Sequence, residues 1–174
     1  MATEAKIFIV DDHEIFREGL QYIIESDKAY KVCGTASNGK EFLGQLLSKK
    51  PNMVLMDVNM PEMDGIEATE RALIMLPKLL VIALSNHNSD ENYLKMIKAG
   101  VKGFVSKGAA KSDLLKAIKD VYMGNNFFSN EILVELLSKM ESNEKSGQNI
   151  QKQETIELTD KEKRVASIYM LRIA

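Results

Sequence analysis

Five side chains that could take part in chemistry stand at or just beyond the ends of short apolar runs. They are Asp11 and Asp12, Asp57, Ser85 and Lys107. A short, uniformly apolar run is typical of a strand buried on both faces of a parallel sheet. The carboxyl ends of parallel strands share one edge of the sheet, and open α/β sheets bind their ligands there. We therefore expect the five side chains to converge on one small pocket if their strands are neighbours.

These residue types together suit the transfer of a phosphoryl group. Three crowded carboxylates repel one another unless a cation joins them. Mg²⁺ prefers oxygen ligands, keeps several waters and also binds phosphate, so it fits such a site. Lys107 would add a point charge, and Ser85 a hydroxyl donor, for the phosphoryl oxygens. With Asp57 held at the end of a rigid strand as the nucleophile, the pattern predicts an aspartyl-phosphate chemistry.

Alternating strand and helix patterns supply the sheet that these residues require. Strand patterns occupy 7–10, 30–36, 53–57, 79–84 and 103–105, and each is followed by a segment with helical spacing. Strict alternation of this kind predicts parallel strands joined by right-handed crossovers, with helices on both faces. The predicted fold class is therefore a doubly wound α/β domain with a five-stranded parallel sheet.

Two helix starts carry local signals. The first helix is predicted to present one apolar face, made of Ile15, Phe16, Gly19, Leu20, Ile23 and Ile24. Asp12 could cap this helix, which is the structural alternative to a metal-binding role and leaves Asp11 without a structural task. Asn38 and Glu41 stand three apart, the spacing of a capped helix start. His13 and His87 have no second ligand at useful spacing and are interpreted as surface residues.

The last fifty residues differ in composition from the rest. A sixth helix is predicted at 130–140, and 141–155 is a polar stretch typical of a flexible linker. Thr159 and Glu162 then form a capping box before one apolar helical face. One capped helix cannot bury that face alone, so we expect it to begin a domain that is incomplete at Ala174. The predicted divisions are 1–124, 125–156 and 157–174.

Composition excludes several classes of protein. The formal net charge of −2 gives no overall attraction to nucleic acid or to an anionic membrane, and no segment has the roughly 18–20 apolar residues of a membrane span. Cys33 is the single cysteine, which rules out an internal disulfide. We expect a soluble, cytoplasmic protein without a membrane partner.

The sequence resembles the receiver domain of response regulators, and its layout resembles the NarL/FixJ type with a LuxR-type helix-turn-helix output. The motifs that carry the resemblance are Val10-Asp11-Asp12-His13, the stretch from Met56 to Gly65, Leu84-Ser85 and the stretch from Lys102 to Lys107. They cover about residues 5–124, and their joint spacing is specific. The match of 158–162 to the start of a LuxR-type domain is shorter and weaker.

The resemblance implies a fold and a set of roles. The strand order would be 2-1-3-4-5, the order known for flavodoxin-like folds. Asp57 would be the phosphoacceptor, Ser85 and Lys107 would contact the phosphoryl group, and Phe104 would be an aromatic switch. The implied Mg²⁺ ligands are Asp11, Asp12, Asp57 and the backbone carbonyl of Asn59.

The function implied is a two-component response regulator that a sensor histidine kinase phosphorylates. Binding to DNA would require the full-length output domain rather than this chain, and phosphorylation could produce a homodimer. One alternative is a stand-alone receiver that acts through protein contacts. Another is an aspartyl-phosphate phosphatase, but Asn59 occupies the place where such enzymes usually carry a second acid. Asn86 and Gly108 also depart from the common receiver pattern, which has a small residue after the serine and a proline after the lysine.

Overall fold

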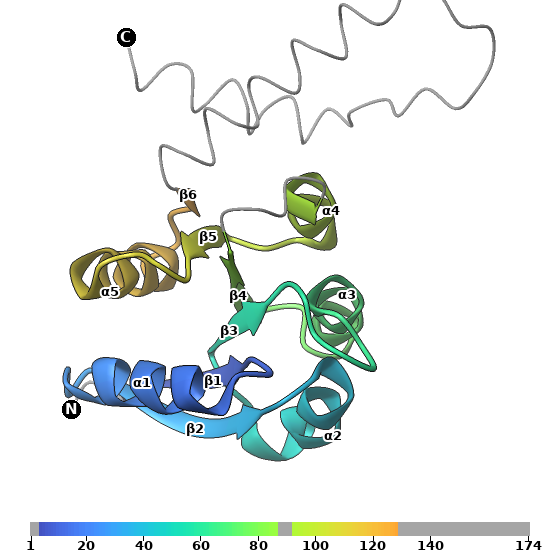
Figure 1. The fold of residues 1–174 in the computed structure, drawn as a ribbon, viewed down its shortest axis with the longest axis horizontal. Coiled ribbons are helices and arrows are strands. Elements are labelled where there is room, and N and C mark those ends of the chain that lie inside the picture. Colours follow the sequence, from blue (N-terminus) through green and yellow to red (C-terminus); the bar gives the residue numbers. More distant parts are fainter. Residues whose placement is uncertain (1–3, 87–91, 129–174) are drawn as a thin grey trace, which may run out of the picture. The chain divides into compact units, whose positions relative to one another are not determined.

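The described part of the chain is an α/β sandwich of three layers (Figure 1). The computed structural model describes residues 4–86 and 92–128. Its strands are β1 (Ala5–Val10), β2 (Tyr30–Ala36), β3 (Met53–Asp57), β4 (Leu80–Ser85), β5 (Gly103–Ser106) and β6 (Phe127–Phe128). Its helices are α1 (Glu14–Glu25), α2 (Gly39–Lys49), α3 (Gly65–Met75), α4 (Asn92–Ala99) and α5 (Lys111–Tyr122). The predicted helix at 130–140, the linker and the capped tail segment lie outside the described residues.

The sheet has the order β2-β1-β3-β4-β5-β6, and every neighbouring pair is parallel. The first five strands confirm the expected order 2-1-3-4-5. The expected strand count is one too low, because β6 pairs with Gly103 and Phe104 and extends the sheet past residue 124. Two residues are too short for the alternation that identifies a strand in a sequence, which explains why β6 was not predicted.

Helices cover both faces of the sheet, as the alternation predicts (Figure 1). Helices α1 and α5 pack on one face through Leu20, Ile24, Leu114 and Ile118, which are buried against β1, β3, β4 and β5. Helices α2, α3 and α4 pack on the other face through Phe42, Leu46, Ala68, Ala72 and Met96. Both faces of the central strands are therefore buried from solvent, which is why those strands are apolar throughout.

The apolar face predicted for α1 is wrong at Ile15, whose side chain is 85% exposed. Leu20 and Ile24 are buried as expected. An α-helix has about 3.6 residues per turn, so the nine positions from Ile15 to Ile24 make about two and a half turns and place the two on opposite sides. Asp12 is not the helix cap either, since that place belongs to His13 and no side chain caps the helix.

Hydrogen bonds define the starts of α2 and α3. The predicted cap of α2 is confirmed, because the Asn38 side chain accepts from the Glu41 backbone N–H at 2.9 Å. The Asp64 side chain caps α3 by accepting from the backbone N–H of Glu67, also at 2.9 Å. Gly65, the first residue of α3, passes so close to β3 that a Cβ atom there would collide with the carbonyl oxygen of Asp57. The turn after β3 can therefore close tightly only with glycine at this position.

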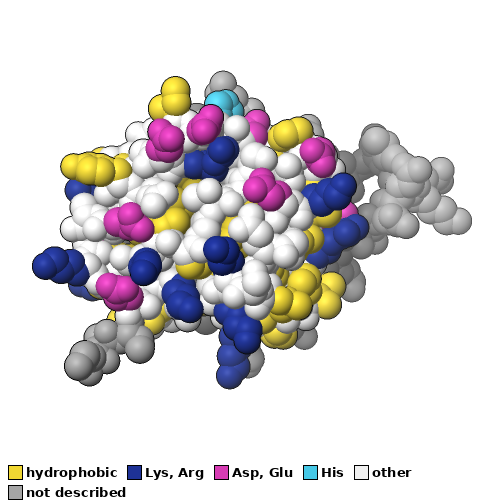
Figure 2. Space-filling model, turned by 90° about the horizontal axis from the view of Figure 1, so that it is seen from below, with side chains coloured by type: hydrophobic (Ala, Val, Ile, Leu, Met, Phe, Trp, Pro, Cys, Tyr) yellow, Lys and Arg dark blue, Asp and Glu magenta, His cyan; other side chains and the backbone are white. Residues whose placement is uncertain are grey.

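The surface carries charges of both signs. On the face drawn in Figure 2, basic and acidic side chains are interspersed rather than gathered into one strongly charged patch, in keeping with the net charge of −2. No helix within 4–86 and 92–128 is both long enough and apolar enough to cross a membrane.

Candidate functional site

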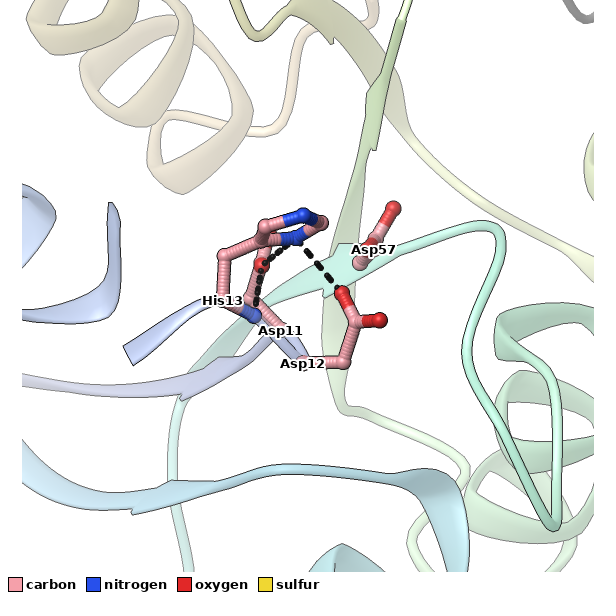
Figure 3. Close-up of side chains that lie close together, drawn as sticks. All are labelled: Asp11, Asp12, His13 and Asp57. Atoms are coloured by element: carbon pink, nitrogen blue, oxygen red, sulfur yellow. Dashed lines mark hydrogen bonds and ion pairs between the residues drawn. The ribbon is translucent and has the colours of Figure 1, made fainter. Parts of the chain in front are cut away.

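Strand register brings the predicted acids to one edge of the sheet. Val10 lies opposite Met56 in the β1–β3 pair, so Asp11, which follows β1, lies next to Asp57 at the end of β3. Asp11 and Asp57 are buried, with 0% and 3% of their residue surface exposed, whereas Asp12 is exposed. Ligand atoms of these three acids and of His13 all lie within 4.8 Å of one another (Figure 3). The predicted convergence of the three carboxylates is therefore present in the structure.

Lys107 joins the two buried carboxylates. Its Nζ atom lies 2.7 Å from Asp11 Oδ2 and 2.7 Å from Asp57 Oδ2. The lysine is held in place at both ends, because its backbone N–H donates to the Ser85 carbonyl at 2.9 Å and its Nζ lies 5.3 Å from the centre of the Phe16 ring. A cation–π contact of this kind favours the ammonium form. The result is a fixed positive charge beside the carboxylate expected to react.

The protonation equilibria reflect this burial. Burial is the main cause that raises the pKa of the Asp57 carboxyl above its ordinary value; the hydrogen bond from Lys107 opposes it, and the charge of Asp11 adds to it. Burial alone would lower the pKa of Lys107, but its hydrogen bonds to Asp11 and Asp57 outweigh this and raise the pKa. The pocket thus holds two buried carboxylates against one ammonium, and it has spare negative charge for a further cation.

Two residues to which the sequence assigned no role at the site hold the loop after β1. His13 is exposed, as expected of a surface residue, but its Nδ1 lies 2.7 Å from Asp12 Oδ1 and 3.4 Å from Asp11 Oδ1 (Figure 3). Its backbone N–H donates to Asp11 Oδ1 at 2.9 Å. The Arg17 guanidinium donates to the backbone carbonyl of Asp11 at 2.6 Å. Helical spacing gave no sign of either contact, because both depend on how the loop enters α1.

Ser85 is buried at the end of β4, one position beyond the residue paired with Asp57. Its hydroxyl lies 3.3 Å from the hydroxyl of Tyr93 in α4. The ring of Tyr93 meets Phe104 edge to face, with the ring centres 5.1 Å apart, and Phe104 is 0% exposed. Phe104 is therefore a core residue in this structure, in contact with the partner of Ser85.

The turn after β3 contributes Asn59. Its backbone N–H donates to Asp57 Oδ1 at 3.3 Å, and its side-chain carbonyl accepts from the Asn92 side chain at 3.1 Å. Beside the pocket lies a depression of about 570 Å³, lined mainly by α1 and also by Asn86, Lys107 and Gly108. The two positions that depart from the common pattern thus flank the approach to Lys107.

A comparison with protein families identifies the domain. Residues 7–119 match the model of the response regulator receiver domain. This chain belongs to the receiver family. The match spans more than half of the chain and contains all the acids of the pocket, the serine and the lysine.

Relatives of this receiver are response regulators. VraR of Staphylococcus saprophyticus is 32% identical over 135 residues, which are 78% of this chain and 65% of VraR. UvrY of Escherichia coli is 35% identical over 136 residues, which are 78% of this chain and 62% of UvrY. The chain thus spans less than two thirds of the length of either relative.

A solved structure extends the likeness to the fold. A LuxR-family two-component response regulator from Aurantimonas sp. superposes with a TM-score of 0.75 at 29% identity. The alignment covers 80% of this chain and 99% of that one. The expected likeness to NarL- and LuxR-type regulators is confirmed.

The acids of this receiver fit a hard divalent cation. Receiver domains bind Mg²⁺ at an acidic pocket, and here three carboxylates stand together with one ammonium between two of them. Carboxylate oxygens are the donors that Mg²⁺ prefers. Asp11, Asp12 and Asp57 would hold the ion, with the backbone carbonyl of Asn59 completing the set proposed from the sequence.

Proposed function

We propose that this chain is the receiver part of a cytoplasmic two-component response regulator and that a sensor histidine kinase phosphorylates it on Asp57 in the presence of Mg²⁺. The observation that carries the proposal is the pairing of a buried Asp57 carboxylate with Lys107 at 2.7 Å, beside two further acids at the ligand edge of the sheet. Burial raises the pKa of this carboxyl, so holding it ionised in the pocket carries a cost to folding.

The geometry supports an in-line displacement at phosphorus. An Asp57 carboxylate oxygen forms the new bond to phosphorus while the bond from phosphorus to the donor, such as an imidazole nitrogen of the kinase, breaks with its electron pair. Lys107 offsets the negative charge on the phosphoryl oxygens, and the rigid end of β3 fixes the direction of attack. Bound Mg²⁺ would neutralise charge on the same oxygens. The Ser85 hydroxyl is the proposed donor to a phosphoryl oxygen once the group is attached.

The remaining parts of the chain are proposed from the sequence. Residues 1–124 would form the receiver domain, 125–156 a helix and linker, and 157–174 the start of a LuxR-type DNA-binding domain. The likeness to a LuxR-family regulator supports a transcriptional output. DNA contacts would belong to the full-length output domain, and phosphorylation would promote a homodimer. The receiver would act as a phosphoryl acceptor rather than as a phosphatase with substrates of its own.

Phosphorylation by a small donor tests the proposal. The 174-residue chain is incubated with acetyl phosphate, with Mg²⁺ or with EDTA, and its intact mass is measured. We expect one phosphoryl group in Mg²⁺, little in EDTA, and none in Asp57→Asn. The matched control is Asp113→Asn, an exposed aspartate in the first turn of α5, which should react as the parent does. Equal phosphorylation of Asp57→Asn and the parent would refute the assignment.

A further inference from the structure

The hydroxyl of Ser85 already has a partner in this structure. It lies 3.3 Å from the hydroxyl of Tyr93, and both residues are almost fully buried, at 1% and 3% exposure. A buried tyrosine hydroxyl needs a hydrogen-bond partner. The two carboxylate oxygens of Asp57 receive their hydrogen bonds from Lys107 and Asn59; within the part of the chain that the structure describes, Ser85 donates none to Asp57. The serine therefore satisfies Tyr93 rather than the phosphoacceptor.

Two contacts tie the first turn of α4 to the site. Tyr93 is the second residue of α4 and contacts Ser85, which ends β4. Asn92 is the first residue of α4 and donates from its side chain to the side chain of Asn59, two positions beyond Asp57. The Tyr93 ring packs against Phe104. A change in the partner of Ser85 therefore acts directly on α4 and on the aromatic core beside it.

We propose that Tyr93 is a positioning residue for the phosphorylation reaction, because its hydroxyl holds the Ser85 hydroxyl in the unphosphorylated chain and competes for it with a phosphoryl oxygen on Asp57. The inference rests on the proposed function of Asp57. Either hydroxyl can donate in the Ser85–Tyr93 contact, and the proposal takes Ser85 as the donor. Its single proton cannot serve both Tyr93 and a phosphoryl oxygen, which only accepts. When Ser85 turns to the phosphoryl group, Tyr93 loses its buried partner, so the Ser85–Tyr93 bond favours the unphosphorylated state.

This competition determines the sign of the effect of Tyr93→Phe. The substitution removes the hydroxyl and keeps the ring against Phe104. In the unphosphorylated chain the substitution removes the Ser85–Tyr93 hydrogen bond. In the phosphorylated chain it removes a buried tyrosine hydroxyl that has lost its partner. Both changes favour the phosphorylated state, because a ligand shifts an equilibrium by its differential interaction with the two states.

The probe is beryllofluoride with Mg²⁺, a mimic of the phosphoryl group, and its affinity for the 174-residue chain is measured by calorimetry. We expect Tyr93→Phe to bind about two- to tenfold more tightly than the parent, the range that a net hydrogen-bond contribution of about 0.5–1.5 kcal/mol gives. Ser85→Ala should bind more weakly. In the Ser85→Ala background, Tyr93→Phe should have no further effect, because the contact is already absent. Tyr22→Phe, whose side chain is 80% exposed on α1, is the matched control and should bind as the parent does.

The double-variant comparison separates the competition from a merely structural role of the tyrosine. Equal or weaker binding by Tyr93→Phe would overturn the proposal, since the hydroxyl would then support Ser85 in the bound state. Tighter binding that persists in the Ser85→Ala background would also overturn it, because the effect would not pass through the serine. Failure of the proposed function has a different signature: the parent would not bind the probe, or Asp57→Asn would bind it equally well.

Discussion

Replacing Lys107 by methionine should destabilise the metal-free domain. The substitution keeps an unbranched side chain of similar length and removes the ammonium, whose Nζ lies 2.7 Å from Asp11 Oδ2 and from Asp57 Oδ2. The substitution leaves both carboxylates without their cation, and because both are buried, water cannot fully replace it. Breaking a buried ion pair from one side costs about 3–5 kcal/mol. We expect about 3 kcal/mol here, at the low end of that range, since exposed Asp12 lets water approach the pocket.

The measurement is urea unfolding in EDTA at pH 7, monitored by circular dichroism. A loss of about 3 kcal/mol corresponds to a midpoint lower by roughly 1–3 M urea. The loss should shrink as the pH falls into the range where carboxylates protonate, because a neutral carboxyl needs no cation. At alkaline pH the raised pKa of Lys107 sets the limit. The stability that the ammonium contributes is complete below the pKa of Lys107 in the unfolded chain, and it is lost as the pH rises through the pKa of Lys107 in the folded chain.

Mg²⁺ supplies a second signature. A cation bound among the acids should stabilise Lys107→Met by more than it stabilises the parent, because it replaces the missing charge and meets no ammonium. The control is Lys116→Met, an exposed lysine of α5, which should change the unfolding free energy little. If Lys107→Met were as stable as the parent in EDTA, or if Mg²⁺ failed to recover part of the loss, the electrostatic description of the pocket would be wrong.

Three further perturbations follow from the geometry. Gly65→Ala should lower both the stability and the phosphorylation rate, since its Cβ would collide with the Asp57 carbonyl oxygen, whereas Gly19→Ala in α1 has open space and should gain about 1 kcal/mol in urea unfolding. Asp57→Asn should raise the unfolding free energy at pH 7 in EDTA. In the parent, the raised pKa of the Asp57 carboxyl means that its ionisation destabilises the folded state. The gain in unfolding free energy should therefore disappear as the pH falls below the pKa of this carboxyl in the unfolded chain. Partial burial raises the pKa of the Cys33 thiol. Cys33 should therefore react with iodoacetamide more slowly in the folded chain than in urea, and equal rates would contradict this burial.

The sequence predicts the sheet and the acid pocket because both depend on local patterns. Apolar runs mark the central strands, and the residue that ends each run must lie at one shared edge; the ion pairs of Lys107 with Asp11 and Asp57 follow from that arrangement. Contacts that depend on how a helix packs are beyond this reasoning. Tyr93 reaches Ser85 only because α4 packs against β4 and β5. The strand β6 was missed for a different reason, because its two residues are too few to show the alternation that identifies a strand.

Chemical trapping of the phosphorylated residue tests the central claim most directly. The chain is phosphorylated by acetyl phosphate in Mg²⁺ and reduced with borohydride, which converts an aspartyl phosphate to homoserine, and its peptides are sequenced by mass spectrometry. We predict homoserine at Asp57 alone, with none when EDTA replaces Mg²⁺. Homoserine at Asp11 or Asp12, or a phosphoryl group on His13 with Asp57 unmodified, would contradict the account.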